Sequence, residues 1–448
     1  MQLSKILGAA SLVVGLSGCA ALLEPEQHYT DVDLTIPTRD NQAIHQRDRT
    51  VLKDQSVLTY VEGILKRLEA THGKPCECQV VVDTSPGYEA YTVSANTIVL
   101  SSGAISQAES EDEVAALIGH ELYHVYENDV LDSMLQDGAI AALRMGAVAA
   151  GEDVTVVFGD SLKEAATGLI YRHFEAQDEI DADAFAVDLL ARAGYSQNGM
   201  NMMIRRLGEY ASEARASAPA AAACLRMDDE GEIFINFTQC TSTLTGADSS
   251  RYLAKEARTE AAMALAMELP DDQRRRSTQG QVPEFYTIEY LDQVADMDFT
   301  SKEALARDLP RIERLDLPPE LADDASLHSK FTAAYLMLGD HERATQALAL
   351  SAQSTYRTPT VFRHLLQVAD YNRDGELVAQ LLHDMDREIG QMPSMLPVEY
   401  YLTRRYDLTV QEGIRLARCA MTLAQDLGLS ELCDVYGDKA DNYTALRW

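Results

Sequence analysis

The residues best suited to chemistry in this 448-residue chain lie in one short run, His120-Glu121-Leu122-Tyr123-His124. In a helix the two histidines would lie on the same face, about 40° apart, so both imidazoles could bind one metal ion. Zinc accepts neutral imidazole nitrogen, and a catalytic zinc takes a third protein ligand and keeps a fourth position for water. Glu121 can act on that water as a general base. The run therefore predicts one zinc ion per chain, with His120 and His124 as ligands and Glu121 as the catalytic residue.

The surroundings of this run favour a metal site over a chance pair of exposed histidines. Ser110-Glu111-Asp112-Glu113 is typical of a capping box, with acidic residues in the first turn of a helix. The helix that follows is largely apolar, and its apolar residues include Ala115, Ala116, Leu117, Ile118 and Val125. Unpaired polar groups are costly in a buried helix. We therefore expect the two imidazoles to have a partner there.

A second acidic run, Glu179-Ile180-Asp181-Ala182-Asp183, is a source for the third ligand, since zinc accepts His, Glu or Asp. By itself such a cluster is more typical of a solvent-exposed helix face. Glu175 and His173 lie just before it and are rival ligands. The residues alone leave this choice open.

Taken together, the two runs and the following Ala193-Gly194-Tyr195 resemble the M48 metallopeptidases, a family that includes HtpX-like and periplasmic BepA-type enzymes. The resemblance implies that Glu179 is the third zinc ligand. It also implies that Asp183, one turn later, is the carboxylate that orients a ligand histidine, a role that fixes the tautomer and raises the basicity of the ring. The activity implied is hydrolysis of polypeptides by a zinc metalloendopeptidase.

Two features depart from the family pattern. Ala176 stands where family members usually have an arginine, three residues before the ligand glutamate. The common Thr-His-Pro segment is also missing, because no histidine occurs between His173 and His328. Arg251 is interpreted as the place where that segment has diverged.

Short strands are expected before the zinc helix. Residues 79–83 and 97–101 are β-branched runs bounded by turn signals. Residues 90–105 resemble the edge strand and small-residue turn of the family. Such an edge strand holds an extended peptide by backbone pairing.

The chain as a whole predicts an α+β fold that is mainly α. We expect a zincin-like peptidase domain with a small sheet over residues 51–265, with an insertion at about 216–250 that holds Cys224 and Cys240. Prolines and charged residues indicate a linker region over 266–325. An α-helical domain is expected over 326–448.

The helical domain contains a weak repeat. Asp340-His341-Glu342 is followed 34 residues later by Asp374-Gly375-Glu376, which is the period of tetratricopeptide repeats. A generic α-helical domain is the alternative. In either case the packed helices are expected to offer a docking surface for protein partners.

The N-terminus is typical of an exported lipoprotein. Lys5 and an apolar stretch after it indicate a signal peptide over 1–18. Leu16-Ser17-Gly18-Cys19 resembles a bacterial lipobox, which implies lipidation of Cys19 and a tether over 19–50; an ordinary signal peptide is the alternative. Ala20 favours the outer membrane. The predicted location is the periplasmic side of that membrane, with a lipid anchor.

Six further cysteines would meet oxidising conditions in an exported chain. Local pairing favours Cys224 with Cys240 and Cys419 with Cys433, although six cysteines allow 15 pairings. Cys76 and Cys78 are expected to form a disulfide or to be free thiols, and not to bind zinc.

The net charge of −33 excludes the basic surface that nucleic-acid binding requires, so no nucleic-acid partner is expected. The negative charge also predicts that acyl chains, and not electrostatic attraction, attach the protein to the membrane. The function favoured is a zinc metalloendopeptidase that cleaves misfolded envelope proteins. A latent peptidase that acts mainly as a chaperone or assembly factor for outer-membrane proteins is the alternative, and a structural zinc lipoprotein is a weaker one.

Overall fold

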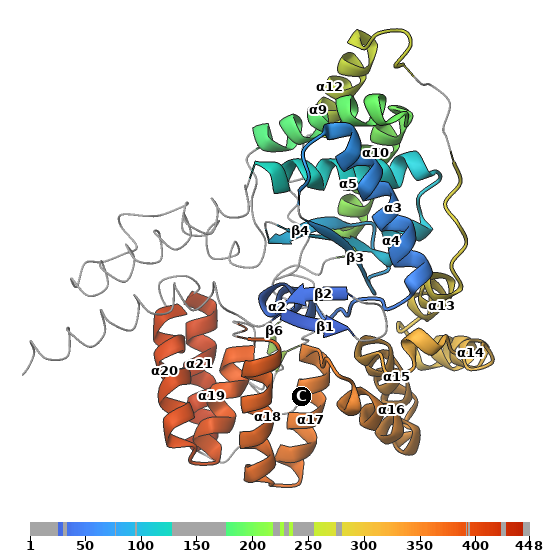
Figure 1. Cartoon of the computed structure of the whole chain (residues 1–448). Coiled ribbons are helices and arrows are strands. Elements are labelled where there is room, and N and C mark those ends of the chain that lie inside the picture. Colours follow the sequence, from blue (N-terminus) through green and yellow to red (C-terminus); the bar gives the residue numbers. More distant parts are fainter. Residues whose placement is uncertain are drawn as a thin grey trace, which may run out of the picture.

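The computed structural model describes residues 26–29, 34–76, 78–94, 96–127, 176–217, 225–227, 233–235, 255–274, 280–390, 392, 395–422 and 427–441. In this part of the chain helices predominate and the largest sheet has three strands (Figure 1). The prediction of a mainly helical α+β fold is therefore confirmed. No helix among the described residues has the length and apolar character to cross a bilayer.

The sheet consists of β3 (Gln79–Asp83), β5 (Thr97–Ser101) and β4 (Ala90–Ser94), in that spatial order. β3 and β5 are the two strands expected from their β-branched runs. They run parallel, whereas β4 is antiparallel to β5 and lies at an edge. Every residue of β5 is buried. Because side chains alternate between the two faces of a strand, both faces of the sheet must be covered.

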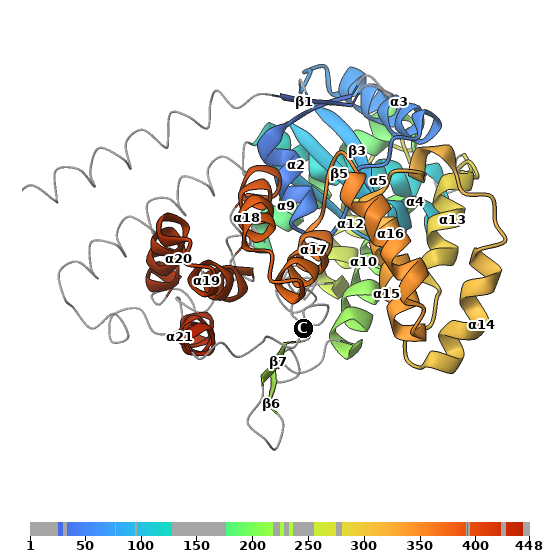
Figure 2. The ribbon, with the colours of Figure 1, turned by 90° about the horizontal axis from the view of Figure 1, so that it is seen from below.

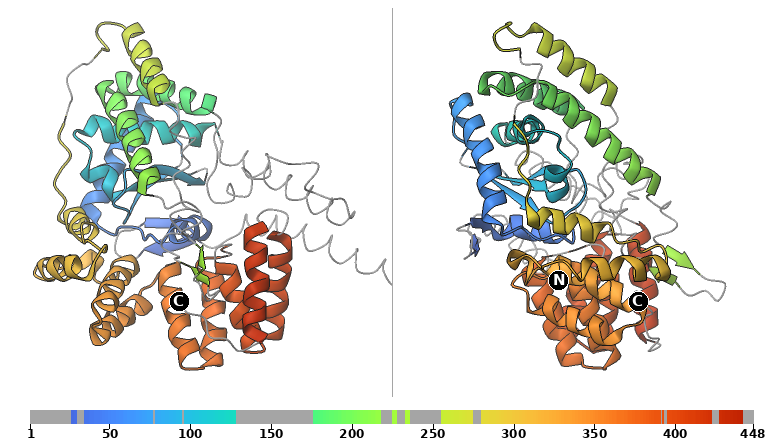
Figure 3. Two further views of the ribbon diagram at one scale, coloured as in Figure 1. Left: turned by 180° about the vertical axis from the view of Figure 1, so that it is seen from behind. Right: turned by 90° about the vertical axis from the view of Figure 1, so that its right-hand side faces the viewer.

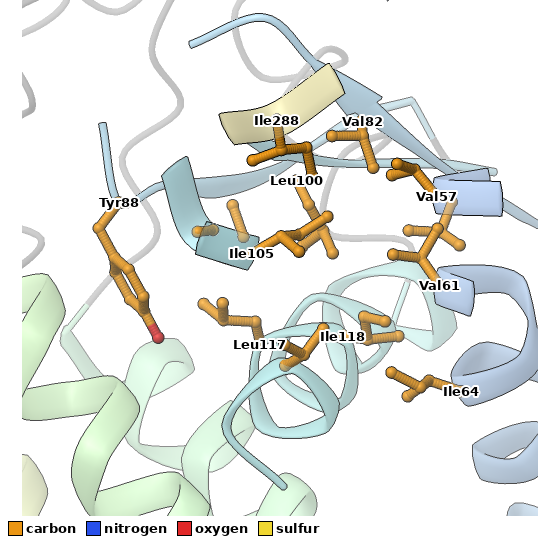
Figure 4. Close-up of a cluster of buried hydrophobic side chains, with 14 of the residues drawn as sticks. Val57, Val61, Ile64, Val82, Tyr88, Leu100, Ile105, Leu117, Ile118 and Ile288 are labelled. Carbon is orange, nitrogen blue, oxygen red and sulfur yellow. The ribbon is translucent and has the colours of Figure 1, made fainter. Parts of the chain in front are cut away.

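One face is covered by helices that form the main hydrophobic core: α3 (Gln55–His72), α4 (Ser102–Ser106), α5 (Glu111–Tyr126), α9 (Ala176–Ala193) and α10 (Asn198–Ser217). Figure 4 shows Leu117 and Ile118 of α5 pointing toward Leu100 of β5 and Ile105 of α4. Burial of each such side chain contributes about 1.5–3 kcal/mol. This packing fixes α5 against the sheet.

The opposite face is covered by a small unit at the N-terminal end of the described chain. It contains the hairpin of β1 (Glu26–Tyr29) and β2 (Leu34–Pro37) and the helix α2 (Thr38–His45). Ile36 and Ile44 form a second cluster with side chains from the other face of the strands, namely Val81, Tyr91 and Val99. The odd and even positions of the strands thus serve different clusters.

The start of α5 differs from the expected capping box. Ser110 is the N-cap residue, but its side chain makes no capping hydrogen bond. The carboxylate of Glu113 does reach back locally, because its Oε2 accepts the backbone N–H of Glu109 (3.0 Å). Its Oε1 also accepts hydrogen bonds from the hydroxyl of Tyr88 (2.7 Å) and from Nε of Arg206 of α10 (2.7 Å). Long-range contacts are thus added to the local one.

The stretch that the sequence indicated as a linker is packed on the main core. It contains α13 (Tyr286–Ala295) and α14 (Lys302–Ile312), and it follows α12 (Lys255–Glu268). Ile288, Leu291, Leu305 and Leu309 are buried in the same cluster as α3 and α5. The short elements predicted from the prolines and charges are present, but their apolar faces pack them against the main core, so they do not form a separate linker.

The C-terminal part is a series of helices, α15 (Ala325–Leu338), α16 (His341–Gln353), α17 (Pro359–Tyr371), α18 (Gly375–Glu388), α19 (Leu396–Arg405), α20 (Thr409–Thr422) and α21 (Leu427–Asp441). Asp340 and Asp374 are the N-cap residues of α16 and α18, and each accepts the backbone N–H three residues on. The two equivalent caps are thus 34 residues apart. Figure 2 shows α19, α20 and α21 grouped together, and a disulfide joins Cys419 to Cys433.

The later helices, α17 to α21, lie on the side of the sheet opposite to α3 and α5, with α2 between α18 and the sheet (Figures 1 and 3). The first helix of the series, α15, contributes Leu327 and Ala334 to the main core. Side chains near α2 fasten the two parts together. The carboxylate of Asp48 accepts the backbone N–H of Thr360 (2.9 Å), and the amide of Gln46 donates to the carbonyl of Ile389 (2.7 Å). The C-terminal helices are therefore docked on the residues that follow α2, which are far away in the sequence.

His45 lies in this junction and predicts that the protein loses stability in acid. The ring is 1% exposed and packs against Tyr356, and neither ring nitrogen has a hydrogen-bond partner among the described residues. Burial lowers the pKa of His45 from 6.5 to about 3. Between these values the unfolded chain binds a proton that the folded chain does not. The free energy of unfolding should therefore fall by about 1.4 kcal/mol per pH unit as the pH drops below 6.5.

Urea unfolding at pH 7, 6 and 5 measures this slope. The variant His45→Phe has an aromatic ring that cannot titrate. Its free energy of unfolding should therefore change less with pH than that of the wild-type protein, by about 1.4 kcal/mol per pH unit. An unchanged slope in that variant would show that His45 does not contribute.

Candidate metal centre

The structure brings three of the predicted ligands together from two helices. His120 and His124 lie one turn apart on α5, and Glu179 lies in the first turn of α9. His120 Nε2 is 3.4 Å from Glu179 Oε2, and His124 Nε2 is 3.9 Å from Glu179 Oε1. The ligand atoms of all three residues lie within 4.8 Å of one another. Two helices that pack face to face thus converge on one point.

The donor set fits a zinc ion. Two imidazole nitrogens and a carboxylate are ligands that zinc takes in catalytic sites. Two ligands at about 2.1 Å from a tetrahedral ion are about 3.4 Å apart, which is close to the separations found here. The three residues are 4%, 0% and 3% exposed. Such burial of three polar groups is costly without a cation to bind them.

Asp183 lies one turn after Glu179 and contacts the far side of the His120 ring. Its Oδ1 is 3.0 Å from His120 Nδ1. This contact leaves Nε2 of His120 turned to Glu179 and to the ligand cluster. A carboxylate in this position fixes the orientation and the tautomer of the ring.

Arg258 of α12 completes the cluster and was not expected from the sequence. It is 2% exposed, and its Nη1 lies 3.1 Å from Glu179 Oε2. Its Nε and Nη2 donate to the two carboxylate oxygens of Asp183, at 2.6 and 2.7 Å. Such a paired contact is among the stronger hydrogen-bonded ion pairs in proteins. One guanidinium thus contacts both Glu179 and Asp183, and the cluster keeps a net negative charge when the imidazoles are neutral.

These contacts shift the titration of the buried groups. Burial alone would lower the pKa of His120, but its hydrogen bonds with Asp183 and Glu179 outweigh burial and raise the pKa to about 9. Burial likewise opposes ionisation of Asp183, and the hydrogen bonds from Arg258 and His120 overcome it, so the pKa of Asp183 is lowered. The metal-free cluster therefore holds a proton on His120 at neutral pH, which a metal ion must displace.

Glu121 points from α5 toward the edge strand β4. It is 2% exposed, and its Oε2 accepts a hydrogen bond from the hydroxyl of Thr92 at 3.0 Å. Thr92 lies on β4, so the edge strand and the carboxylate between the two histidines are in direct contact. No motif in the sequence singles out Thr92.

The position of Arg258 on its helix indicates that its side chain is buried. Ala262, Leu265, Ala266 and Leu269 pack on the main core from α12 and its end. Arg258 lies one turn before Ala262 and therefore shares this apolar face. A charged residue within a buried face is rarely left without an opposite charge.

Several residues named from the sequence lie outside the described residues, among them the rival ligands. They are Cys19, His173, Glu175, Cys224, Cys240 and Arg251. Cys76 and Cys78 are joined by a disulfide, in line with one of the two expected states.

Comparison with known proteins gives the following similarities. A family model described as peptidase family M48 matches residues 52–259. The chain is 25% identical over 231 residues to the metalloprotease LoiP of Escherichia coli K12, which is 49% of this chain and 90% of LoiP. It is 25% identical over 212 residues to a Vibrio cholerae serotype O1 protein assigned as a beta-barrel assembly-enhancing protease, which is 44% of this chain and 41% of that protein.

A third similarity is to the mitochondrial metalloendopeptidase OMA1 of Arabidopsis thaliana, with 25% identity over 175 residues. The match covers 39% of this chain and 32% of that protein. The chain thus matches less than half of the length of the last two relatives. All three matches are far shorter than the chain itself.

Proposed function

Since residues 52–259 form a peptidase domain of family M48, we propose that this metalloprotease is a zinc endopeptidase, anchored by lipid in the bacterial envelope, that cleaves misfolded envelope proteins. The observation that carries the proposal is the buried cluster of His120, His124 and Glu179 next to Glu121. Two imidazoles, one carboxylate and a neighbouring general base are the groups that zinc-dependent peptide hydrolysis requires.

In this proposal His120, His124 and Glu179 hold one zinc ion. A zinc ion in that place supplies a Lewis acid for the scissile carbonyl and activates a water molecule. Asp183 holds the ring of His120 in the tautomer whose Nε2 is free to act as a ligand. Arg258 keeps Glu179 and Asp183 in place through three contacts.

Glu121 is the residue that moves protons. Its carboxylate takes a proton from the attacking water and returns it to the amide nitrogen of the leaving peptide. The hydrogen bond from Thr92 to Oε2 orients the carboxylate for this transfer. The edge strand therefore orients the general base.

The edge strand β4 is proposed as the place where the substrate lies. It pairs only with β5 among the described strands. An extended peptide could add to its outer edge by backbone hydrogen bonds, which depend little on side-chain identity. A substrate bound in this way would lie beside the strand that contacts Glu121. Unfolded polypeptides, which expose extended backbone, suit such a site.

The location in the envelope rests on the sequence and on one relative. Leu16-Ser17-Gly18-Cys19 supports a lipid anchor at Cys19, and the acidic chain would stay away from an anionic bilayer surface. A relative assigned as a beta-barrel assembly-enhancing protease supports a role in the assembly of envelope proteins. The helices α15 to α21, with caps 34 residues apart, are proposed as the surface that binds protein partners.

The test uses purified protein with Cys19→Ala, incubated with casein. We expect cleavage that a chelator abolishes and that added zinc restores. Elemental analysis should find one zinc per chain, and much less in Glu179→Ala. Cleavage that is insensitive to the chelator would contradict the proposal. One bound zinc without cleavage of casein or of denatured envelope proteins would favour the alternative, a latent peptidase that acts as an assembly factor.

A further inference from the structure

A disulfide lies outside the metal centre, in the loop between α3 and β3. It joins Cys76 and Cys78, which are separated by a single residue. Both cysteines are half-buried and pack against the rim of the main core. The function proposed above does not use this bond.

The bond contributes little as a fold-stabilising crosslink. A disulfide stabilises a protein mainly by restricting the unfolded chain, and this effect grows with the length of the loop that it closes. Cys419 and Cys433 are 14 residues apart, join α20 to α21, and are 4% and 2% exposed. They have the features of a structural disulfide. Cys76 and Cys78 close almost no loop and lie closer to solvent, and exposed disulfides are the more easily exchanged ones.

A carboxylate lies directly against one of the two sulfurs. Glu69 Oε1 accepts the backbone N–H of Cys76 at 2.8 Å and lies 3.0 Å from Cys76 Sγ. The backbone N–H of Cys78 points to Cys76 Sγ at 3.2 Å. A thiol at Cys76 would therefore donate its proton to Glu69, and a thiolate there would accept the N–H of Cys78.

The geometry points to a redox-active disulfide at Cys76 and Cys78, which exchanges with an external dithiol and uses Glu69 as the proton acceptor of Cys76. The negative charge of Glu69 repels a thiolate from Cys76, so the incoming thiolate attacks Cys78 Sγ. A proton from solvent, relayed by Glu69, reaches Cys76 Sγ as the bond between the two sulfurs breaks, so that Cys76 leaves as a thiol and no thiolate remains beside the carboxylate.

The second thiol of the reductant then attacks the mixed disulfide. Cys78 leaves as a thiol, and the reductant leaves as its own disulfide. Two electrons and two protons have passed from the dithiol to the chain. In the reverse reaction, a disulfide oxidant accepts the electrons, and Glu69 takes the proton of Cys76 as this sulfur attacks Cys78 to close the bond again.

The loop that carries this pair is attached to the zinc-site helix. The hydroxyl of Tyr126, the last residue of α5, donates to the carbonyl of Lys74. His72 packs on the ring of Tyr126, with 4.4 Å between the ring centroids. Exchange at Cys76 and Cys78 therefore takes place next to the helix that carries His120 and His124.

The experiment compares the two disulfides within one folded protein. The full chain is treated with dithiothreitol for increasing times, free thiols are alkylated, and the peptides of each cysteine pair are quantified by mass spectrometry. We expect the bond between Cys76 and Cys78 to be reduced at least about tenfold faster than that between Cys419 and Cys433. In urea, where the fold no longer protects either bond, the two rates should approach each other. An equal or slower rate for Cys76 and Cys78 in the folded protein would overturn the proposal, as would free thiols at these positions after treatment with a disulfide oxidant.

The role of Glu69 has its own test. Glu69→Gln keeps an oxygen that accepts the backbone N–H of Cys76 but loses the proton acceptor. After reduction, we expect glutathione disulfide to re-form the bond about tenfold more slowly in this variant. The matched control is Glu62→Gln, an exposed glutamate of the same helix that pairs with Lys66. An oxidation rate equal to that of the control would exclude Glu69 from the reaction.

Discussion

Replacing Glu121 with glutamine will lower the rate of casein cleavage by about 10²–10⁴-fold and leave the zinc content of the protein unchanged. Glutamine has the same shape and can still accept the hydrogen bond from Thr92, but it cannot take a proton from water. The three ligand residues are not altered, so the metal should bind as before. The measurements are kcat/KM on a fluorogenic casein and zinc per chain by elemental analysis.

Glu127→Gln is the matched control for this variant. Glu127 caps the C-terminal end of the same helix and is exposed. Its loss should leave both the rate and the zinc content unchanged. If Glu121→Gln cleaved casein as fast as this control, the assignment of Glu121 as general base would be wrong. If it also lost its zinc, Glu121 would instead be needed to build the centre.

Replacing Arg258 with methionine should lower the free energy of unfolding of the metal-free protein by about 3–5 kcal/mol. Methionine fills most of the space of the arginine stem but leaves Glu179 and Asp183 buried without their cation. Removing one partner of a buried ion pair costs more than the pair contributes, because the remaining charge cannot reach water. The proton on His120 can balance only one of the two carboxylates. Urea unfolding at pH 7 measures the loss.

The difference between this variant and the wild-type protein should depend on pH in a defined direction. Arg258 helps to lower the pKa of Asp183, and a carboxyl whose pKa is lowered on folding adds stability above its unfolded pKa, which is lost in acid. The difference should therefore shrink only as the pH falls below 3.8, the ordinary pKa of such a carboxyl. Arg205→Met serves as the control, because this arginine is 53% exposed and its loss should cost at most about 1 kcal/mol. Equal losses in the two variants would refute a special role for Arg258.

Some parts of the site could be predicted from the sequence because they depend on contacts within one helix. His120, Glu121 and His124 are placed by the helical period alone. Glu179 and Asp183 are likewise one turn apart on α9, and the resemblance to M48 peptidases, now confirmed by the match over residues 52–259, singled them out from a cluster of acidic residues. Local periodicity and a known motif were sufficient for these residues.

Other parts depend on segments that meet only in the folded protein. Arg258 contacts Glu179 and Asp183, and no motif in the sequence singled it out. The carboxylate of Glu113 accepts a local backbone N–H, as a residue of the first helical turn can, but it also binds Tyr88 and Arg206, which are distant in the sequence. Residue type and spacing do not identify such long-range partners, because a buried charge binds the nearest opposite charge in space.

The sequence by itself determined that this chain carries a two-histidine metal motif on a buried helix, an acidic second helix, short strands and a helical C-terminal part. These features follow from side-chain periodicity, which a local backbone conformation converts directly into a face. Only the tertiary structure decided that Arg258 and Thr92 complete the site, and that residues 286–312 belong to the peptidase core. It also decided that the C-terminal helices dock on α2, where Gln42 donates to the carbonyl of Arg387. The physical reason is that burial and ion pairing depend on distances between elements, which the spacing of residues along the chain does not contain.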